Sequence, residues 1–385
     1  MSSQIAASAP LDIALLAPLV SPIRQPYLGG AQALLRDLAV GLAARGHAVT
    51  LYASQGSDPD ILPGVTLIEL VVDQSRVRPT DFAALEAHQP PAPVDPAVEE
   101  AFERAIERIA AHKPQHQLAH AHAYDEPAFR LAQRLPMPVA HTLHMSAVDP
   151  SVLRTLASLA PANADRTADQ PWLVTVSQSA AATYRDACRI DAVIYNGLDV
   201  ATIPFGLTPA PEAYALYAGR ITPEKGVEDA IHIALKARMR LFLVGGIYDQ
   251  RYYDTRIAPL LSLHPTQLTY LGPQPREEVW RLMSGARAVI VPSLWDEPFG
   301  LAPCEAQAAG APVVGYESGG LREVVAQGET GALVPRGDIA EAAHALSNIA
   351  HFSRSACRLR VENLFSLDAT IAAYEAFYQR MLTAS

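Results

Sequence analysis

The sequence predicts an α/β protein of two Rossmann-like domains, each built on a doubly wound parallel sheet and facing the other across an interdomain cleft. Three observations lead to this fold. The 385 residues suffice for two domains, or three, at roughly 150 residues each. Short β-branched or leucine-rich runs alternate with longer amphipathic stretches, which is the pattern of βαβ units. A proline-rich segment without periodicity, Asp199–Glu212, separates the two halves.

The first half contains short apolar runs that we expect to be strands. They are Asp12–Ala17, Ala48–Tyr52, Val65–Leu70, Gln117–His122, Val139–Leu143, Leu173–Val176 and Ala192–Tyr195. Helices are expected over Ala31–Ala44 and Val98–His112, where apolar residues recur at helical spacing. These elements make up a predicted first domain of residues 1–203.

The second half repeats the alternation. Its expected strands are Ala215–Ala218, Arg240–Val244, Gln267–Leu271, Ala288–Val291 and Pro312–Val314. They belong to a predicted second domain of residues 204–365. A last helical pattern, Ala369–Leu382, falls in a predicted C-terminal segment of residues 366–385.

Composition excludes several classes of protein. Lys and Arg total 30 against 40 Asp and Glu, so the formal charge of -10 argues against nucleic acid as a partner. The cysteines at 188, 304 and 357 form no CxxC pair, so neither a disulfide framework nor a cysteine zinc site is expected. No secretory or membrane-spanning segment is recognised, and stable membrane insertion is not expected. The sequence therefore favours a cytoplasmic protein.

Two glutamates mark the most informative stretch, Pro292–Gly310. Glu297 lies in a loop after a strand-like run, and Glu305 follows eight positions later in the first turns of a helix. A helix N-terminus favours phosphate, whereas carboxylates accept hydrogen bonds from vicinal diols. The combination indicates a nucleotide-sugar, with its ribose diol, diphosphate and hexose diol. Two solvated glutamates near a helix start are the alternative, and spacing alone does not decide between them.

Two cations follow the strand at Ala215–Ala218. Arg220 and Lys225 lie five positions apart on one loop, where they could hold a diphosphate from two sides. Surface Arg and Lys are more often simply solvated. A glycine pair, Gly29–Gly30, precedes the first helix and would allow close backbone approach to a ligand, or merely form a turn. It is not the GxGxxG fingerprint, which disfavours a nicotinamide enzyme.

The histidines offer a rival interpretation. Seven of the 12 fall between His88 and His144, and residues 120 and 122 would share one face of a strand. Together with His141 and His144 they could bind a metal, as in a metal-dependent hydrolase. Core histidines with backbone partners are the plainer interpretation. The acidic sequence Asp58-Pro59-Asp60 could also hold a metal, but its surroundings favour an Asp–Pro turn.

Several stretches together resemble the retaining glycosyltransferases of family 4, which have the GT-B fold. In the second half, EPFGLAPCE (297–305) is similar to the family's E-x7-E motif and GRITPEKG (219–226) to its phosphate-binding segment. SGGLREVV (318–325) and GETGALVPRGD (328–338) are similar to the segments that follow. The first-half counterparts are YLGGAQ (27–32), AHAH (119–122), TLH (142–144), VSQS (176–179) and VIYNGLD (193–199).

The resemblance implies a role for each candidate residue. Glu297 would hold hexose hydroxyls and Glu305 the ribose diol. Arg220 and Lys225 would neutralise the diphosphate, with Gly29 and Gly30 approaching it. Backbone N–H groups would reach the sugar from a short segment: Phe299, Gly300 and Leu301. His122 would lie near the anomeric carbon of the transferred sugar.

The function expected from the resemblance is a retaining, metal-independent transfer of a hexose from a nucleotide-sugar to a hydroxyl acceptor. The donor would be a UDP-sugar and the acceptor a soluble small molecule or glycan. No cofactor is expected beyond the donor substrate, and no metal ligand. The alternatives are a hydrolase using His120, His122, His141 and His144, or a non-catalytic sensor of nucleotide-sugars. The C-terminal helix would return to the first domain.

Overall fold

The computed structural model describes residues 9–25, 27, 30–73, 95–212 and 214–384, and these fall into two compact units. Unit 1 comprises the described residues of Met1–Val176, Ala181–Gly197 and Leu367–Ser385. Unit 2 comprises those of Ser177–Ala180 and Leu198–Ser366. The chain therefore passes from unit 1 to unit 2 at residues 197–198, six residues before the expected domain boundary, and returns at residues 366–367.

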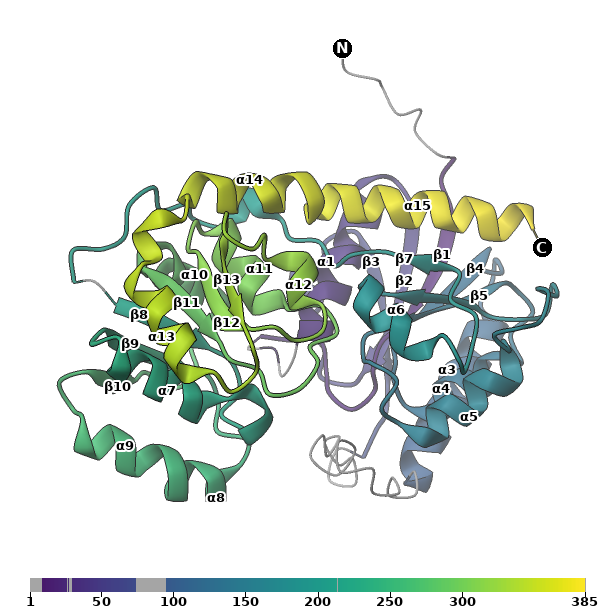
Figure 1. The fold of residues 1–385 in the computed structure, drawn as a ribbon. Coiled ribbons are helices and arrows are strands. Elements are labelled where there is room, and N and C mark those ends of the chain that lie inside the picture. The colour runs from purple at the N-terminus through teal and green to yellow at the C-terminus, as the bar shows by residue number, and fades with distance from the viewer. Residues whose placement is uncertain (1–8, 26, 28–29, 74–94, 213, 385) are drawn as a thin grey trace, which may run out of the picture. The chain divides into compact units, whose positions relative to one another are not determined.

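Unit 1 is built on a seven-stranded parallel sheet in the order β3-β2-β1-β4-β5-β6-β7 (Figure 1). Its strands are β1 (Asp12–Leu16), β2 (Ala48–Ser54), β3 (Val65–Leu70), β4 (Leu118–Ala121), β5 (Val139–Leu143), β6 (Trp172–Thr175) and β7 (Ala192–Val193). The strands expected from the first half of the sequence are all present. Each neighbouring pair is parallel, as βαβ alternation predicts.

Helices of unit 1 cover this sheet. They are α1 (Gly30–Ala44), α3 (Pro96–Ala111), α4 (Glu126–Ala132), α5 (Pro150–Leu159), α6 (Gln178–Tyr184, whose first residues group with unit 2) and α15 (Leu367–Thr383). Helix α3 begins after an N-cap, because the Asp95 carboxylate accepts a hydrogen bond from the Ala97 N–H at 2.8 Å. Along one side of α15, Tyr374, Phe377, Tyr378 and Met381 are buried in the same apolar cluster as β1 and α1.

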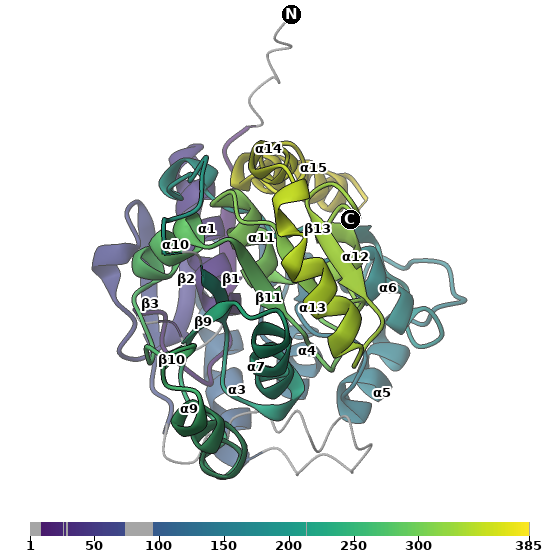
Figure 2. The ribbon, with the colours of Figure 1, turned by 60° about the vertical axis from the view of Figure 1, so that its left-hand side comes forward.

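Unit 2 is built on a six-stranded parallel sheet in the order β10-β9-β8-β11-β12-β13. Its strands are β8 (Tyr214–Ala218), β9 (Arg240–Val244), β10 (Leu268–Tyr270), β11 (Ala288–Val291), β12 (Val313–Tyr316) and β13 (Gly331–Val334). Its helices are α7 (Val227–Lys236), α8 (Gln250–Tyr252), α9 (Ala258–Leu263), α10 (Arg276–Gly285), α11 (Leu301–Ala308), α12 (Leu321–Val324), α13 (Ile339–Ser347) and α14 (Arg354–Leu364). Helices α7 and α13 pack side by side on the sheet (Figure 2).

One strand of unit 2, β13, has no counterpart among the expected strands. Its four residues, Gly331–Val334, lie between a turn and Pro335, so the apolar run is too short and too closely bounded to be recognised. Pairing with a neighbouring strand stabilises the extended conformation that the local sequence does not predict, because β13 pairs in parallel with β12 along its full length.

The acidic sequence at 58–60 forms the expected turn. Residues Pro59–Ile61 make a single 3₁₀ turn, and the Asp58 carboxylate accepts a hydrogen bond from the Asp60 N–H at 2.9 Å. The Asp58 side chain therefore caps its own turn.

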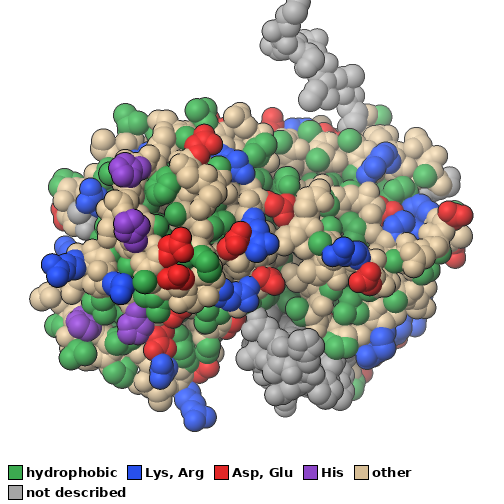
Figure 3. Space-filling view, viewed as in Figure 1, with side chains coloured by type: hydrophobic (Ala, Val, Ile, Leu, Met, Phe, Trp, Pro, Cys, Tyr) green, Lys and Arg blue, Asp and Glu red, His purple; other side chains and the backbone are tan. Residues whose placement is uncertain are grey.

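The surface agrees with the mixed charge of the sequence. On the face seen in Figure 3, basic and acidic side chains of the described residues are interspersed. No helix in the described ranges is long and apolar enough to cross a membrane.

Candidate functional site: a carboxylate–cation cluster in unit 2 and a histidine pair in unit 1

The parallel sheet of unit 2 brings two of its loops together. Strands β8 and β11 are neighbours, so the segments that follow them emerge at the same edge. The first carries Arg220 and Lys225, and the second carries Glu297. The two loops meet, because Lys225 Nζ lies 2.6 Å from Glu297 Oε1. Of the two predicted cations, Lys225 thus contacts the first glutamate directly.

Lys225 is positioned by a tight backbone turn. Residues Pro223–Lys225 form a 3₁₀ turn that ends at Gly226, whose φ is 67°. A Cβ at Gly226 would lie 1.9 Å from the carbonyl oxygen of Pro292, so only glycine fits between the two loops. The Lys225 ammonium also lies 4.8 Å from the ring centre of Trp295, within cation–π distance.

Glu297 is a buried carboxylate, 9% exposed, that stays ionised. Burial alone would raise its pKa, but the charge and hydrogen bond of Lys225 and the hydrogen bond from Ser293 Oγ at 2.7 Å outweigh it. Its pKa therefore lies below the ordinary value. An ionised carboxylate accepts hydrogen bonds only, which suits it to sugar hydroxyls.

The SGGLREVV segment fixes the backbone of Glu297. The Gly320 N–H donates to the Glu297 carbonyl at 2.7 Å. Gly319 has a φ of 48°, and a Cβ there would lie 2.2 Å from the same carbonyl oxygen. Further along the segment, the Glu323 carboxylate accepts hydrogen bonds from the backbone N–H groups of Gln178 and Ser179 at 2.9 and 2.8 Å. Two of the recognised motifs therefore hold each other.

The second glutamate lies on α11, which begins directly after the Glu297 loop. Phe299 precedes the helix and is 2% exposed, Gly300 is its N-cap residue with a φ of 102°, and Leu301 is its first residue. Glu305 forms an ion pair with Arg276, with Nε and Oε1 2.9 Å apart. Arg276 in turn lies 4.6 Å from the ring centre of Trp280. Sequence reasoning did not single out Arg276.

Arg220 has neighbours of its own. Its Nη2 lies 3.5 Å from Glu224 Oε1, and its guanidinium is 5.6 Å from the ring centre of Tyr248. Its side chain is 28% exposed, so it remains accessible to a ligand at the strand edge.

Three predicted site residues, Gly29, Gly30 and His122, belong to unit 1. Gly30 is the first residue of α1, while Gly29 lies outside the described residues. His122 directly follows β4 and is 2% exposed. Its Nδ1 lies 2.9 Å from Nε2 of His144, which follows β5. Burial, with smaller contributions from neighbouring histidines, places the pKa of His122 well below its ordinary value, so the ring is neutral at pH 7.

The histidine pair borders a small cavity. The cavity has a volume of about 20 Å³, enough for a water-sized group. It is lined by Leu34, Leu38, His122, His144, Asn196, Gly197, Leu367, Thr370 and Tyr374. His122 Nε2 is buried and has no hydrogen-bond partner among the described residues. This nitrogen can therefore serve a bound hydroxyl or water.

The four histidines of the hydrolase alternative do not converge on one point. Both ring nitrogens of His120 form hydrogen bonds with hydroxyl groups. Nδ1 pairs with Tyr378 at 2.7 Å and Nε2 with Thr142 at 2.8 Å. The His141 ring packs 4.7 Å from the ring centre of Phe129 and has no polar partner in the described part of the chain. The metal ligand set suggested by the sequence is therefore not assembled here.

Burial of His141 is expected to make the stability of the fold depend on pH in the acidic range. Burial lowers its pKa to about 3, so below pH 6.5 the unfolded chain binds a proton that the folded state does not. The contribution of buried, neutral His141 to the free energy of unfolding is fully present above that pH. It is lost as the pH decreases, by about 2 kcal/mol at pH 5 for this one group. We expect His141→Phe to reduce the drop in Tm between pH 7.5 and 5.0 in calorimetry. His351→Ala, at an exposed position, serves as the control, and an unchanged drop in His141→Phe would contradict the assignment.

Comparison with known proteins agrees with this geometry. Residues 28–202 match the family described as Glycosyltransferase Family 4, and residues 202–360 match Glycosyl transferases group 1. The D-inositol 3-phosphate glycosyltransferase of Mycolicibacterium smegmatis is 29% identical over 97% of this chain and 92% of its own length. That of Mycobacterium tuberculosis is 28% identical over 98% and 85%.

Solved structures share the fold. Sucrose-phosphate synthase from Thermosynechococcus elongatus matches with a TM-score of 0.76 at 24% identity, over 97% of this chain and 100% of that structure. Anabaena HepE in complex with UDP and glucose matches with a TM-score of 0.70 at 18% identity, over 96% and 100%. The two family matches are consecutive and meet at residue 202, close to the passage between the units. The chain therefore belongs to the family 4 glycosyltransferases and is a transferase with two parallel-sheet domains of the GT-B type.

Proposed function

We propose that this glycosyltransferase is a retaining, metal-independent hexosyltransferase that uses a UDP-sugar donor and a hydroxyl acceptor. The observation that carries the proposal is the contact between Lys225 and Glu297 at the edge of the unit 2 sheet, directly before the N-terminus of α11. A cation, an ionised carboxylate and the N-terminus of a helix are thereby within one short stretch of structure. These are the groups that a diphosphate linked to a hexose requires.

The charge of the leaving group explains why both cations are needed. Cleavage of the bond between sugar and diphosphate places negative charge on the departing nucleoside diphosphate. We propose that Arg220, Lys225 and the N-terminus of α11 stabilise this charge, in the role that a divalent ion plays elsewhere. Because Lys225 also contacts Glu297, the cation on the diphosphate and the carboxylate on the hexose hold each other in position.

The two carboxylates are proposed to bind different diols. Glu297 would accept hydrogen bonds from hexose hydroxyls, with the backbone of Phe299, Gly300 and Leu301 reaching the same sugar. Glu305 would accept from the ribose diol. Its pairing with Arg276 supports this role, since the guanidinium holds one carboxylate oxygen in place and so orients the other.

In unit 1, we propose that His122 contacts the transferred sugar or the acceptor hydroxyl. The ring is neutral, and its Nδ1 is held by His144, so its Nε2 is presented in a fixed orientation. Gly29 and Gly30 remain predicted neighbours of the diphosphate. Retention of the anomeric configuration rests on the family resemblance.

The choice of donor and acceptor follows the relatives. HepE binds UDP and UDP-glucose in its solved structures, and the mycobacterial relatives are named for D-inositol 3-phosphate. We therefore propose UDP-hexoses as donors and polyol or glycan hydroxyls as acceptors, with D-inositol 3-phosphate the first acceptor to test.

Thermal-shift measurements with UDP-, GDP- and ADP-sugars in the presence of EDTA test the proposal. A donor at 100 times its Kd stabilises the folded state by about 2.7 kcal/mol, which raises Tm measurably. We expect UDP-sugars to give this shift, and transfer with D-inositol 3-phosphate or a glycan to retain the anomeric configuration by NMR. Loss of activity with EDTA, or no response to any nucleotide-sugar, would refute it. Binding without hydrolysis or transfer would instead identify a sensor.

A further inference from the structure

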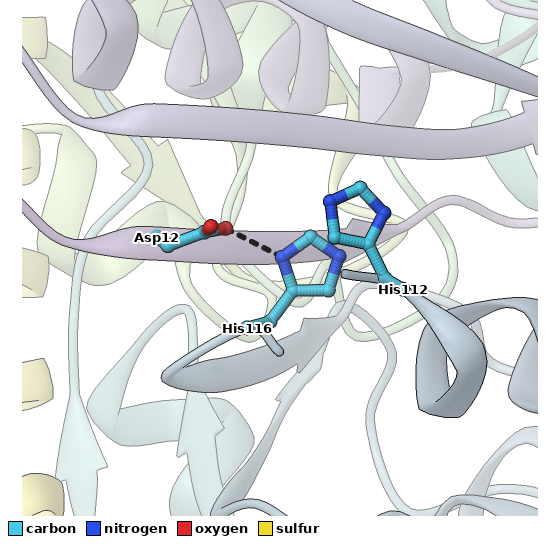
Figure 4. Close-up of side chains that lie close together, drawn as sticks. All are labelled: Asp12, His112 and His116. Atoms are coloured by element: carbon cyan, nitrogen blue, oxygen red, sulfur yellow. Dashed lines mark hydrogen bonds and ion pairs between the residues drawn. The ribbon is translucent and has the colours of Figure 1, made fainter. Parts of the chain in front are cut away.

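A group of one aspartate and two histidines, side chains of the kinds that bind metals, lies at the opposite end of the unit 1 strands from His122. Asp12 is the first residue of β1, His112 is the C-cap residue of α3, and His116 lies two residues before β4 (Figure 4). Strands β1 and β4 are parallel neighbours, so their starting ends meet. His116 and His122 thus stand at opposite ends of the same strand, β4.

The three side chains are close to one another. Asp12 Oδ1 lies 2.5 Å from His116 Nδ1, and the His112 ring stacks on the His116 ring with centres 4.0 Å apart. One ligand atom from each of the three lies within 4.8 Å of the others, and this is the group found in the described residues that could hold a metal ion. One adjustment is needed, because a metal ion bound to His116 Nδ1 would take the place of the hydrogen bond between this nitrogen and Asp12 Oδ1.

The other nitrogen of His116 already has a partner. Its Nε2 lies 3.0 Å from the hydroxyl of Tyr52, and this contact orients the ring from the side opposite to Nδ1. Histidines that bind metals commonly donate their second N–H to such an oxygen. When His116 binds through Nδ1, its proton resides on Nε2 and is donated to the Tyr52 oxygen. Tyr52 is thus placed to make the outer-sphere contact that a metal-bound His116 would need.

The burial of the group fits a site that ions can reach. His116 is 2% exposed, while the Asp12 side chain is 25% exposed and His112 is half-buried. The ion would have one anchored ligand on the inside and two ligands on the solvent side. Two imidazoles and one carboxylate are a ligand set typical of zinc and related divalent metals.

We propose that Asp12, His112 and His116 form a binding site for a divalent transition metal ion, for which Zn²⁺ is the probe. The site joins the start of β1 to the α3–β4 connection. It lies at the other end of β4 from His122, so the ion would stabilise unit 1 and take no part in sugar transfer. A metal-independent transferase and a zinc site are therefore compatible in one chain.

Calorimetric titration of untagged, EDTA-treated full-length protein with ZnCl₂ tests this proposal. We expect saturable binding of one ion per chain, a raised Tm, and visible absorption bands of a low-symmetry complex when Co²⁺ replaces Zn²⁺. Because His116→Ala removes a buried ring, the test uses the more exposed ligands. His112→Ala and Asp12→Asn are each expected to weaken Zn²⁺ binding at least tenfold.

The control is His232→Ala, which removes a histidine on α7 in unit 2 whose Nε2 lies 3.8 Å from Glu228. It should bind Zn²⁺ like the wild type. Absence of stoichiometric binding, or wild-type affinity in both His112→Ala and Asp12→Asn, would overturn the proposal. UDP-sugar binding, measured on the same variants, should be unchanged whichever result is obtained, so the metal site and the proposed transferase function are tested separately.

Discussion

Replacing Lys225 with alanine is expected to lower kcat by about two to three orders of magnitude, the usual effect of losing one preorganised group that stabilises developing charge. The ammonium group lies 2.6 Å from Glu297 and is proposed to neutralise the leaving diphosphate. Its removal also takes away the main electrostatic contribution that keeps the pKa of Glu297 low. Steady-state assays with a UDP-sugar measure the loss.

Lys236→Ala provides the matched control, because Lys236 is an exposed cation at the end of α7 in the same unit. Its activity should equal that of the wild type. The double variant Arg220→Ala, Lys225→Ala should also bind UDP much more weakly. Unchanged UDP affinity in the double variant would contradict the proposed diphosphate site.

The paired glutamates should separate binding from turnover. Glu305→Gln keeps the shape of the side chain but loses its charge, so we expect UDP affinity to fall by about 10- to 100-fold, the value of hydrogen bonds to a charged group. Glu297→Gln should chiefly lower kcat and leave UDP affinity nearly unchanged, because the hexose hydroxyls that Glu297 is proposed to bind are absent from UDP. Titration of both variants with UDP, beside kinetics with the UDP-sugar, distinguishes the two roles.

A nucleotide that lacks one ribose hydroxyl tests the proposed contact between Glu305 and the ribose directly. If Glu305 accepts from the ribose diol, 2′-deoxy-UDP should bind the wild type more weakly than UDP does, and the difference should shrink in Glu305→Gln. An equal penalty in both proteins would place the diol elsewhere. Equal effects of Glu297→Gln and Glu305→Gln on UDP affinity would contradict the proposal that one glutamate binds the hexose and the other the ribose.

Most of the fold could be predicted because parallel strands are continuous apolar runs. Four of them, Val65–Leu70, Val139–Leu143, Arg240–Val244 and Ala288–Val291, begin and end where the sequence indicates. Strand β13 could not be recognised, because its four residues gain their strand character from pairing with β12. The return of α15 to unit 1 was expected from the family resemblance alone.

The site was predictable where its residues lie in one motif and unpredictable where partners are distant. Lys225 and Glu297 are 72 positions apart, but strand order implies that they meet. Nothing local to Glu305 indicates its partner Arg276, 29 positions earlier.

The histidines show the same limit. Residues 120 and 122 do lie close, with ring centres 4.1 Å apart, yet the hydroxyl groups that bind His120 come from Thr142 and from Tyr378 at the far end of the chain. The alternation of side chains along a strand determines on which face of the sheet each one lies. It does not predict which side chains from distant segments will contact that face.

The position of α15 affects the order in which the protein can mature on the ribosome. Most of unit 1 is synthesised before unit 2, but Tyr374, Phe377 and Tyr378 of its core are added only after the whole of unit 2. At 5–20 residues per second, about ten seconds or more separate the emergence of Gly197 from that of the final helix. Until then the nascent half must keep a large apolar face uncovered, so unit 1 is completed only after residues 367–383 have been translated.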